Sequence, residues 1–369
     1  MDEKLTSFIT TEYKIWKWKI APIDILLLVF TIVFGLMLRS KVWMINGPYD
    51  VDVNLLGGMA DPMLSVSISA DILMAALGGI YVFLLTGAKR KGYLTYSVLF
   101  LSPVTAMGSA MAKSGDGIWL SFMLLAFIFA FRKNRVPAII SALLAAACSP
   151  YILTRMQNLP LFLSTVSRLI NAYRPQKLLS YHFPNVYQLI GPDAFVPEYE
   201  KVGLALTLAA AVALLAWARG YLGKNVGKSF EEKTGNTVNA KQTTGSDETS
   251  GDNAAAVKLL TVVLFVGWVL TYICPGMDER AGLMTMVLSL CFVMAYPKYY
   301  YLAIVEMILD FLPGAAFFRG ESFLPLSWAA MIRLLMILYF YSRVIRVTKA
   351  GTDDRKDKDA KDFDNKDQK

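Results

Sequence analysis

Carboxylates and cations occur beside the apolar runs of this sequence, in combinations that could bind charged ligands. Asp116 begins one such run, and Glu279 and Arg280 lie together in a short polar stretch between two others. Asp50 and Asp52 belong to a polar stretch that follows the first apolar run. Carboxylates of this kind bind a divalent cation or pair with arginines. Each group alone is equally typical of a turn or a solvated loop, so its chemistry depends on which groups the fold brings together.

A second set of charged residues lies between positions 155 and 201, among several aromatic residues. Arg168, Arg174 and Lys177 precede the single histidine of the chain, His182. The topology derived below places this segment outside the cytoplasm, where lysine and arginine are normally depleted. Cations there are explained by contact with lipid headgroups or by a phosphate-bearing ligand. The aromatic residues around His182 are also typical of a belt at the membrane interface.

The composition is that of a membrane protein. Hydrophobic residues make up 55% of the 369 residues and charged residues 18%, and the mean hydropathy is +0.45. The net charge of +8 does not indicate nucleic-acid binding, because the basic residues flank apolar runs, as positive-inside topology and anionic lipids require. The three cysteines have no metal-ligand spacing and are interpreted as packing residues.

The apolar runs predict an all-α polytopic protein with roughly ten transmembrane helices, since about 20 residues of helix cross a bilayer. The runs cover 21–38, 72–86, 93–111, 117–131, 136–154, 202–218, 257–273, 283–296, 299–317 and 326–341. Ser149-Pro150 is expected to kink or end the fifth run. Lys14, Lys17 and Lys19 precede the first run and place the N-terminus in the cytoplasm, and the even number of crossings places the C-terminus there too.

This topology divides the chain into four parts. A transmembrane core over 1–223 carries outer loops at 39–71 and 155–201. Residues 224–256, rich in small polar and charged residues, predict a disordered cytoplasmic linker. Further transmembrane helices over 257–347 precede a charged cytoplasmic tail at 348–369. One polytopic unit, rather than two soluble domains, is expected.

The same topology maps the chemistry-bearing residues onto one face. The stretch with Asp50 and Asp52, the start of the run at Asp116, the segment 155–201 and the loop with Glu279 and Arg280 all fall outside. If these loops converge, they form a carboxylate-and-cation site at the membrane surface. The sequence has no Gly-x-x-x-x-Gly-Lys-Ser/Thr loop and no His-Glu-x-x-His or Cys-x-x-Cys pattern. These absences argue against an ATP-driven pump and an intramembrane zinc protease.

Three stretches resemble the GT-C membrane glycosyltransferases, in particular bacterial relatives of the second mannosyltransferase of glycosylphosphatidylinositol synthesis. Ser114-Gly-Asp116-Gly and the apolar run after it resemble the family's Gln-x-Asp-Ser and helix, with Ser for Gln and Gly for the second Ser. His182-Phe-Pro-Asn-Val-Tyr-Gln-Leu-Ile-Gly191 is similar to its Phe/Tyr-Pro-Asn-x-Tyr segment. Met277-Asp-Glu-Arg280 is similar to its Met-His-Glu-Arg-Tyr, with Asp for His and Ala for Tyr. The three occur in family order between 113 and 282.

The resemblance implies that a hexose, mannose in the family, moves from a polyprenyl-phosphate donor to a glycan or glycolipid acceptor outside the membrane, with inversion. An acid of the first outer loop acts as general base in such enzymes, which makes Asp50 the first candidate and Asp52 the second. Arg280, with one of Arg168, Arg174 or Lys177, is expected to bind the leaving phosphate. His182, Asn185 and Tyr187 are expected to bind sugar or phosphate. Asp116 and Glu279 would position substrate or hold the cations.

Two other functions are compatible with the same residues. A transporter or flippase of lipid-linked glycans would use the cations without chemistry, and Glu306 and Asp310, four apart on one helical face, support it if they lie at membrane depth. A non-catalytic subunit of envelope assembly would keep the fold without the activity. The short loops and length favour a bacterial plasma membrane. No cofactor is required, although the outer carboxylates could bind a divalent metal.

Overall fold

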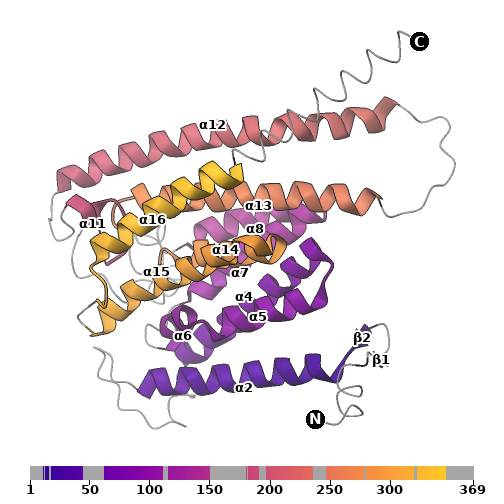
Figure 1. Ribbon diagram of the computed structural model, residues 1–369, viewed down its shortest axis with the longest axis horizontal. Helices are drawn as coiled ribbons and strands as arrows, with labels where there is room; N and C mark the ends of the chain where they lie inside the picture. The colour runs from indigo at the N-terminus through magenta and orange to yellow at the C-terminus, as the bar shows by residue number, and fades with distance from the viewer. Residues whose placement is uncertain are drawn as a thin grey trace.

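The computed structural model is a bundle of helices with one short β-hairpin (Figure 1). It describes residues 11, 13–15, 18–44, 62–110, 115–149, 180, 182–190, 197–235, 247–277, 280–319 and 322–345. The hairpin pairs β1 (Tyr13–Ile15) with β2 (Trp18–Ile20) in antiparallel register. It leads directly into α2 (Pro22–Met44).

Six helices contain segments long and apolar enough to span a membrane, namely 22–40, 64–86, 201–222, 253–273, 297–316 and 326–345. They belong to α2, α4 (Pro62–Thr86), α12 (Pro197–Gly235), α13 (Asp247–Ile273), α15 (Tyr300–Arg319) and α16 (Leu326–Phe340). The segment 297–316 begins with the 3₁₀ turn η1 (Pro297–Tyr299), and 326–345 ends with the π-helical turn η2 (Tyr341–Ile345). The chain is therefore a helical membrane protein, as its composition predicts.

The shorter helices are α5 (Lys89–Leu101), α6 (Pro103–Ala110), α7 (Asp116–Phe131), α8 (Arg135–Ala147), α11 (Tyr187–Ile190) and α14 (Leu283–Ala295). The single run predicted over 93–111 is split between α5 and α6. Pro103 has no N–H to continue the helix, and the hydroxyl of Thr105 donates instead to the carbonyl of Leu99 (2.8 Å). The fifth predicted run ends at Ala147, before Pro150, as expected.

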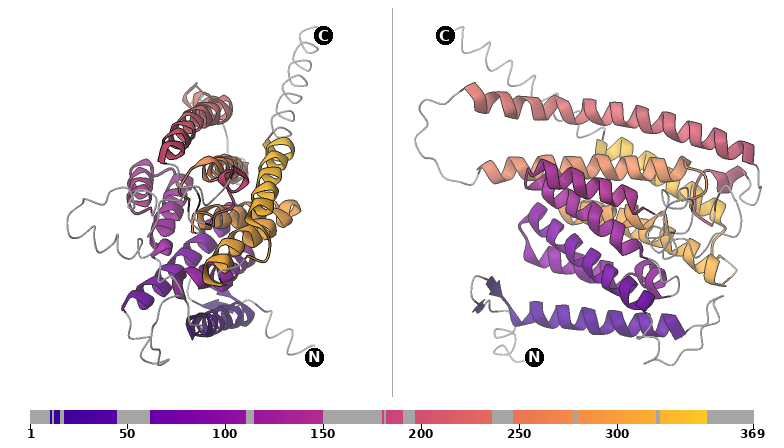
Figure 2. Two further views of the ribbon diagram at one scale, coloured as in Figure 1. Left: turned by 90° about the vertical axis from the view of Figure 1, so that its left-hand side faces the viewer. Right: turned by 180° about the vertical axis from the view of Figure 1, so that it is seen from behind.

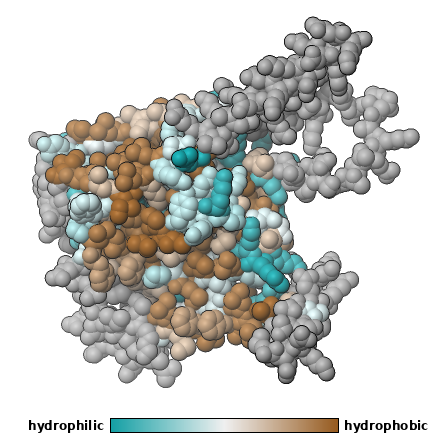
Figure 3. Space-filling model, viewed as in Figure 1, coloured by the Kyte–Doolittle hydropathy of each residue, from teal (hydrophilic) through white to brown (hydrophobic). Residues whose placement is uncertain are grey.

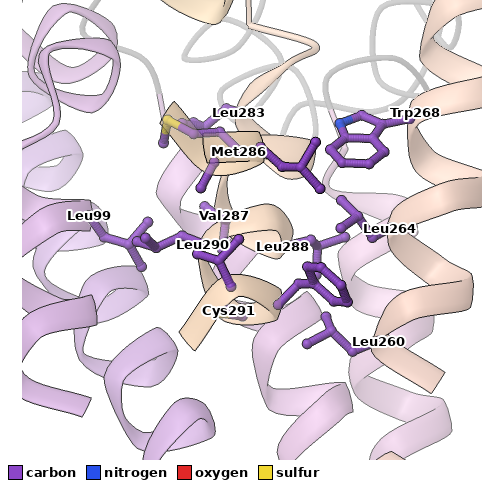
Figure 4. Packing of buried hydrophobic residues seen from close by; sticks show 14 of the residues in the cluster. Leu99, Leu260, Leu264, Trp268, Leu283, Met286, Val287, Leu288, Leu290 and Cys291 are labelled. Atoms are coloured by element: carbon purple, nitrogen blue, oxygen red, sulfur yellow. The ribbon is translucent and has the colours of Figure 1, made fainter. Parts of the chain in front are cut away.

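Helix α14 lies at the centre of the bundle (Figure 4). It packs against α4, α5, α13 and α15, and almost all of its side chains are buried. Leu260, Leu264 and Trp268 approach it from α13, and Leu99 approaches it from α5 (Figure 4). Because every face of α14 meets another helix, its apolar residues are not confined to one stripe.

Helices α2 and α12 lie at opposite edges of the bundle (Figure 1; Figure 2). Their outward side chains, among them Leu26 and Phe30 on α2 and Leu208 and Leu215 on α12, are exposed and apolar. Apolar residues also spread over the face formed by α15 and α16 (Figure 3). Exposed apolar surface on this scale is typical of helices that contact lipid.

The structure corrects three predicted boundaries. The loop predicted over 39–71 is helical at both ends, because α2 continues to Met44 and α4 begins at Pro62. The linker predicted over 224–256 is helical up to Gly235 and again from Asp247. Within the loop predicted over 155–201, α11 and the start of α12 are helical. Polar composition misplaced these ends, because the backbone hydrogen bonds of a helix do not require apolar side chains.

Candidate functional site

The segment 180–190 is fastened to the C-terminal end of α13. Ser180 forms a parallel β-bridge with Met277. The backbone N–H of Val186 donates to the carbonyl of Tyr272 (3.0 Å), and the hydroxyl of Tyr187 donates to the carbonyl of Ile273 (3.1 Å). The last carbonyls of a helix have no partner within it, so this segment supplies the donors that α13 needs.

Hydrogen bonds within the segment fix its shape. The Ser180 hydroxyl donates to the carbonyl of Phe183 (2.7 Å) and accepts from the amide of Gln188 (3.0 Å). His182 has a φ of 63°, in the left-handed region that few non-glycine residues adopt. This turn exposes the imidazole of His182 while it buries the ring of Phe183.

The buried ring of Phe183 contacts a charged cluster in the core. The guanidinium of Arg333 on α16 lies over this ring, 4.5 Å from its centroid. Arg333 forms an ion pair with Asp310 and a longer one with Glu306 (3.4 Å), both on α15. All three charged side chains are 0–1% exposed. The cluster therefore places ionisable groups of two helices directly beneath the segment 180–190.

Two further helices complete this cluster. The hydroxyl of Thr285 on α14 lies 2.5 Å from the Oε1 of Glu306. A Cβ at Gly282, which precedes α14, would overlap the Asp310 carboxylate, so only glycine allows this approach. The N-terminus of a helix favours a nearby negative charge, which makes the start of α14 a suitable place for Asp310. The hydroxyl of Tyr272 on α13 is buried within electrostatic range of Arg333.

Several polar atoms of this cluster have no hydrogen-bond partner within the described part of the chain. They are the Oε2 of Glu306, the Oδ2 of Asp310, the Nε and Nη1 of Arg333 and the Tyr272 hydroxyl. Buried polar atoms are nearly always hydrogen-bonded in native proteins. These unused donors and acceptors are therefore able to bind ordered water or a ligand.

A separate cluster joins α2, α4 and α7 near Asp116. Arg39 on α2 forms a buried ion pair with Asp71 on α4 (2.6 Å). Asp116, in the first turn of α7, is also buried and acts electrostatically on Asp71. A Cβ at Gly117 would lie 2.6 Å from the backbone of Ala70, so the start of α7 rests directly on α4. Asp116 is thus held beside Asp71 by close backbone packing.

Five of the predicted site residues have described side chains. His182 is exposed, whereas Asp116, Asn185, Tyr187 and Arg280 are buried. The others, Asp50, Asp52, Arg168, Arg174, Lys177 and Glu279, lie outside the described residues. The structure joins the segments 180–190 and 272–277, and the convergence of the outer loops into one site stays a prediction.

Asn185 and Tyr187 hold the two segments together. The side-chain amide of Asn185 donates to the carbonyl of Cys274 (3.3 Å), and its oxygen accepts the backbone N–H of Tyr187 (3.2 Å). Burial, and to a lesser extent the nearby Cys274, raises the pKa of Tyr187 above its usual value. The phenol therefore stays protonated and keeps its bond to Ile273. The binding of sugar or phosphate by these two residues remains a prediction.

Sequence reasoning missed Arg39, Asp71 and Arg333. The signal was present, because each is an ionisable residue within or at the edge of an apolar run, and such residues mark functional or paired sites in membrane helices. Glu306 and Asp310 were noted for this reason, but the identity of their partner required the packing of α15 on α16.

Comparisons with known proteins identify no relative. No protein-family model matches the chain, no curated protein matches its sequence, and no solved structure matches its fold. Its function must therefore be argued from its own residues.

Proposed function

We propose that this protein is an integral membrane glycosyltransferase of the GT-C type. It would transfer a hexose, mannose by resemblance, from a polyprenyl-phosphate carrier to a glycan or glycolipid acceptor on the extracytoplasmic side. The observation that carries the proposal is the contact between segments 180–190 and 272–277, because each adjoins or contains one of the stretches that resemble this family. Residues nearly 90 positions apart, such as Asn185 and Cys274, are hydrogen-bonded there.

The position of this contact also supports the proposal. Helices α6 and α11 lie at the end of the bundle opposite the β1–β2 hairpin (Figure 1). Under the predicted topology, with the N-terminus in the cytoplasm and ten crossings, that end faces outside, and α2 ends there at Met44, before the stretch with Asp50 and Asp52 (Figure 1). A lipid-linked donor reaches such a site from the bilayer and requires no nucleotide-binding loop.

The proposed reaction is an inverting displacement. The acceptor oxygen forms a bond to the anomeric carbon while the bond from that carbon to the phosphate oxygen breaks. Asp50, with Asp52 as the second candidate, takes the hydroxyl proton, and the carrier leaves as polyprenyl phosphate. Arg280 and a cation of segment 155–177 stabilise the phosphate by charge-assisted hydrogen bonds. Proton transfer to a positioned base contributes about 10²–10⁴-fold to rate.

The test is sugar transfer by the purified protein in lipid discs, with a panel of polyprenyl-phosphate sugars and glycolipid acceptors. We expect Asp50→Asn to lower turnover by about 10²-fold or more, and Arg280→Ala to lower it as well. Arg132→Ala is the matched control, since Arg132 is exposed at the far end of α7. Thermal unfolding of each variant separates lost activity from lost folding.

Binding of the lipid donors without cleavage of the anomeric bond, for every acceptor in the panel, would contradict the enzyme proposal. It would favour the second candidate, a transporter or flippase of lipid-linked glycans. The observation in favour of that candidate is the burial of Glu306, Asp310 and Arg333 within segments that are long enough to cross a membrane, since such residues often line substrate pathways. A lipid-translocation assay in vesicles then distinguishes the two functions.

A further inference from the structure

We propose that Glu306 and Asp310 hold one proton between them, so that with Arg333 they form a proton-binding site in the helical core. The proposal does not depend on the glycosyltransferase function. It rests on the charge balance of the cluster and on its unused polar atoms.

The charge balance requires a proton. Two carboxylates face one guanidinium, and all three side chains are 0–1% exposed. Among the residues that the structure describes, Thr285 from α14 and Tyr272 from α13 also reach this cluster, and neither adds a positive charge. The fully ionised cluster would carry one uncompensated negative charge, which is strongly unfavourable in a buried environment. A single proton makes it neutral and adds almost no volume.

Thr285 contacts the carboxyl pair at Glu306. The Oγ1 of Thr285 lies 2.8 Å from the carbonyl oxygen of Gly282 and 2.5 Å from the Oε1 of Glu306. A hydroxyl group has only one hydrogen to donate. The carbonyl of Gly282 already accepts the backbone N–H of Met286 (2.9 Å), so the Thr285 hydroxyl can donate to the Oε1 of Glu306. A distance of 2.5 Å is within the range of O–H···O hydrogen bonds.

The remaining polar atoms also point to a small, mobile ligand. The Oε2 of Glu306 and the Oδ2 of Asp310 are buried and accept no hydrogen bond from any described residue. The Nη2 of Arg333 contacts both carboxyl groups and occupies the place where a metal ion would have to bind. A proton can move between these oxygens, whereas a metal would have to displace the guanidinium.

The site is connected to the exposed end of the bundle. Arg333 contacts the carboxyl pair on one side and the ring of Phe183 on the other. Loss of the proton leaves a second full negative charge beside Arg333, and this draws the guanidinium towards the carboxylates and away from the ring. Occupancy of the site therefore influences how firmly the segment 180–190 is held.

Infrared spectroscopy of the purified protein in lipid discs tests the proposal without any substrate. A protonated carboxyl group has a C=O stretch separate from carboxylate bands, and that stretch shifts in D₂O. We expect wild type at neutral pH to show this band and Glu306→Gln to lack it. Asp310→Asn should lack it as well, because either substitution leaves one carboxylate for one guanidinium. Asp24→Asn, in the first turn of α2, is the control that should retain it.

The proposal is overturned if the wild-type spectrum minus the Glu306→Gln spectrum contains carboxylate bands alone, because both groups would then be ionised. Should Glu306→Gln fail to fold, the Asp310→Asn difference spectrum decides in the same way. Because glutamine imitates the protonated acid, we further expect Glu306→Gln to have the same unfolding temperature as wild type near pH 6. Wild type alone should lose stability as the pH rises, since its folded state binds more protons than its unfolded state.

Discussion

Two buried arginines of this protein have similar surroundings and different hydrogen bonding. Arg39 lies over the ring of Phe100 (4.1 Å to the centroid), and Arg333 lies over the ring of Phe183 (4.5 Å). Each is paired with an aspartate of another helix, Asp71 or Asp310. Both arginines are 0–1% exposed.

The five N–H donors of Arg39 are all used. Nε donates to the hydroxyl of Ser109, Nη1 to the carbonyls of Gly35 and Phe100, and Nη2 to Asp71 and the hydroxyl of Thr105. Arg333 instead leaves Nε and Nη1 without a partner among the described residues. A fully satisfied buried charge fastens helices together, whereas a partly satisfied one retains the capacity to bind. The hydrogen bonds of Arg39 therefore indicate a structural role for that arginine, whereas Arg333 belongs to the candidate site.

Replacement of Arg39 should have the largest effect on stability. Arg39→Met leaves Asp71 without its arginine partner in the core and removes the hydrogen bonds from Arg39 to α5 and α6. We expect the free energy of unfolding to fall by about 3–5 kcal/mol, as measured by denaturant or thermal unfolding in detergent. Arg333→Met should cost less, because Arg333 makes fewer hydrogen bonds to the described residues than Arg39 does. Equal losses of stability in Arg39→Met and Arg333→Met would contradict the proposed difference between the two arginines.

A methyl group at Gly117 should have an intermediate effect. Gly117→Ala forces the start of α7 away from Ala70 and moves Asp116 relative to Asp71, and overpacking of this kind costs about 1–3 kcal/mol. Gly108→Ala is the matched control, because nothing lies within 4 Å of a Cβ at that helical position. It should stabilise the protein by about 0.5–1 kcal/mol. An unchanged free energy of unfolding in Gly117→Ala would mean that the start of α7 can move away from α4 without cost.

Loss of the Tyr187 hydroxyl should have the smallest effect. Tyr187→Phe removes one hydrogen bond to the end of α13 and retains the ring, so we expect a loss of about 0.5–1.5 kcal/mol. Limited proteolysis should show faster cleavage near residues 180–190, whereas Tyr300→Phe, an exposed tyrosine on α15, should leave the rate unchanged. Unchanged cleavage in Tyr187→Phe would show that the contacts of Ser180, Asn185 and Val186 hold the segment without the Tyr187 hydroxyl.

The positions of the helices were largely predictable because they depend on local composition. The apolar run 257–273 lies within α13, and the run 283–296 coincides with α14 apart from its last residue. Helix ends were less predictable, as at Met44 and Pro62, because polar residues can continue a helix when tertiary contacts satisfy them. Arg39 was assigned to a loop, but it lies in α2 and forms an ion pair with Asp71 on α4.

The candidate site was predictable only in part. The similarity of 182–191 and 277–280 to one family suggested that they act together, and the structure joins 180–190 to 272–277 by hydrogen bonds. Arg333 could not be assigned to it, since nothing local distinguishes an arginine that faces two carboxylates from one that faces lipid headgroups. The face on which a charge lies depends on the neighbouring helices.

By itself, the sequence determined that this protein is helical and resides in a membrane, because long apolar runs can satisfy their backbone only as helices in lipid. The tertiary structure alone decided which charges meet. Arg39 pairs with Asp71 and Arg333 with Asp310 across 32 and 23 residues, separations that no helical period relates. Such pairs exist because helix packing buries both partners, and burial is unfavourable for a charge that has no partner.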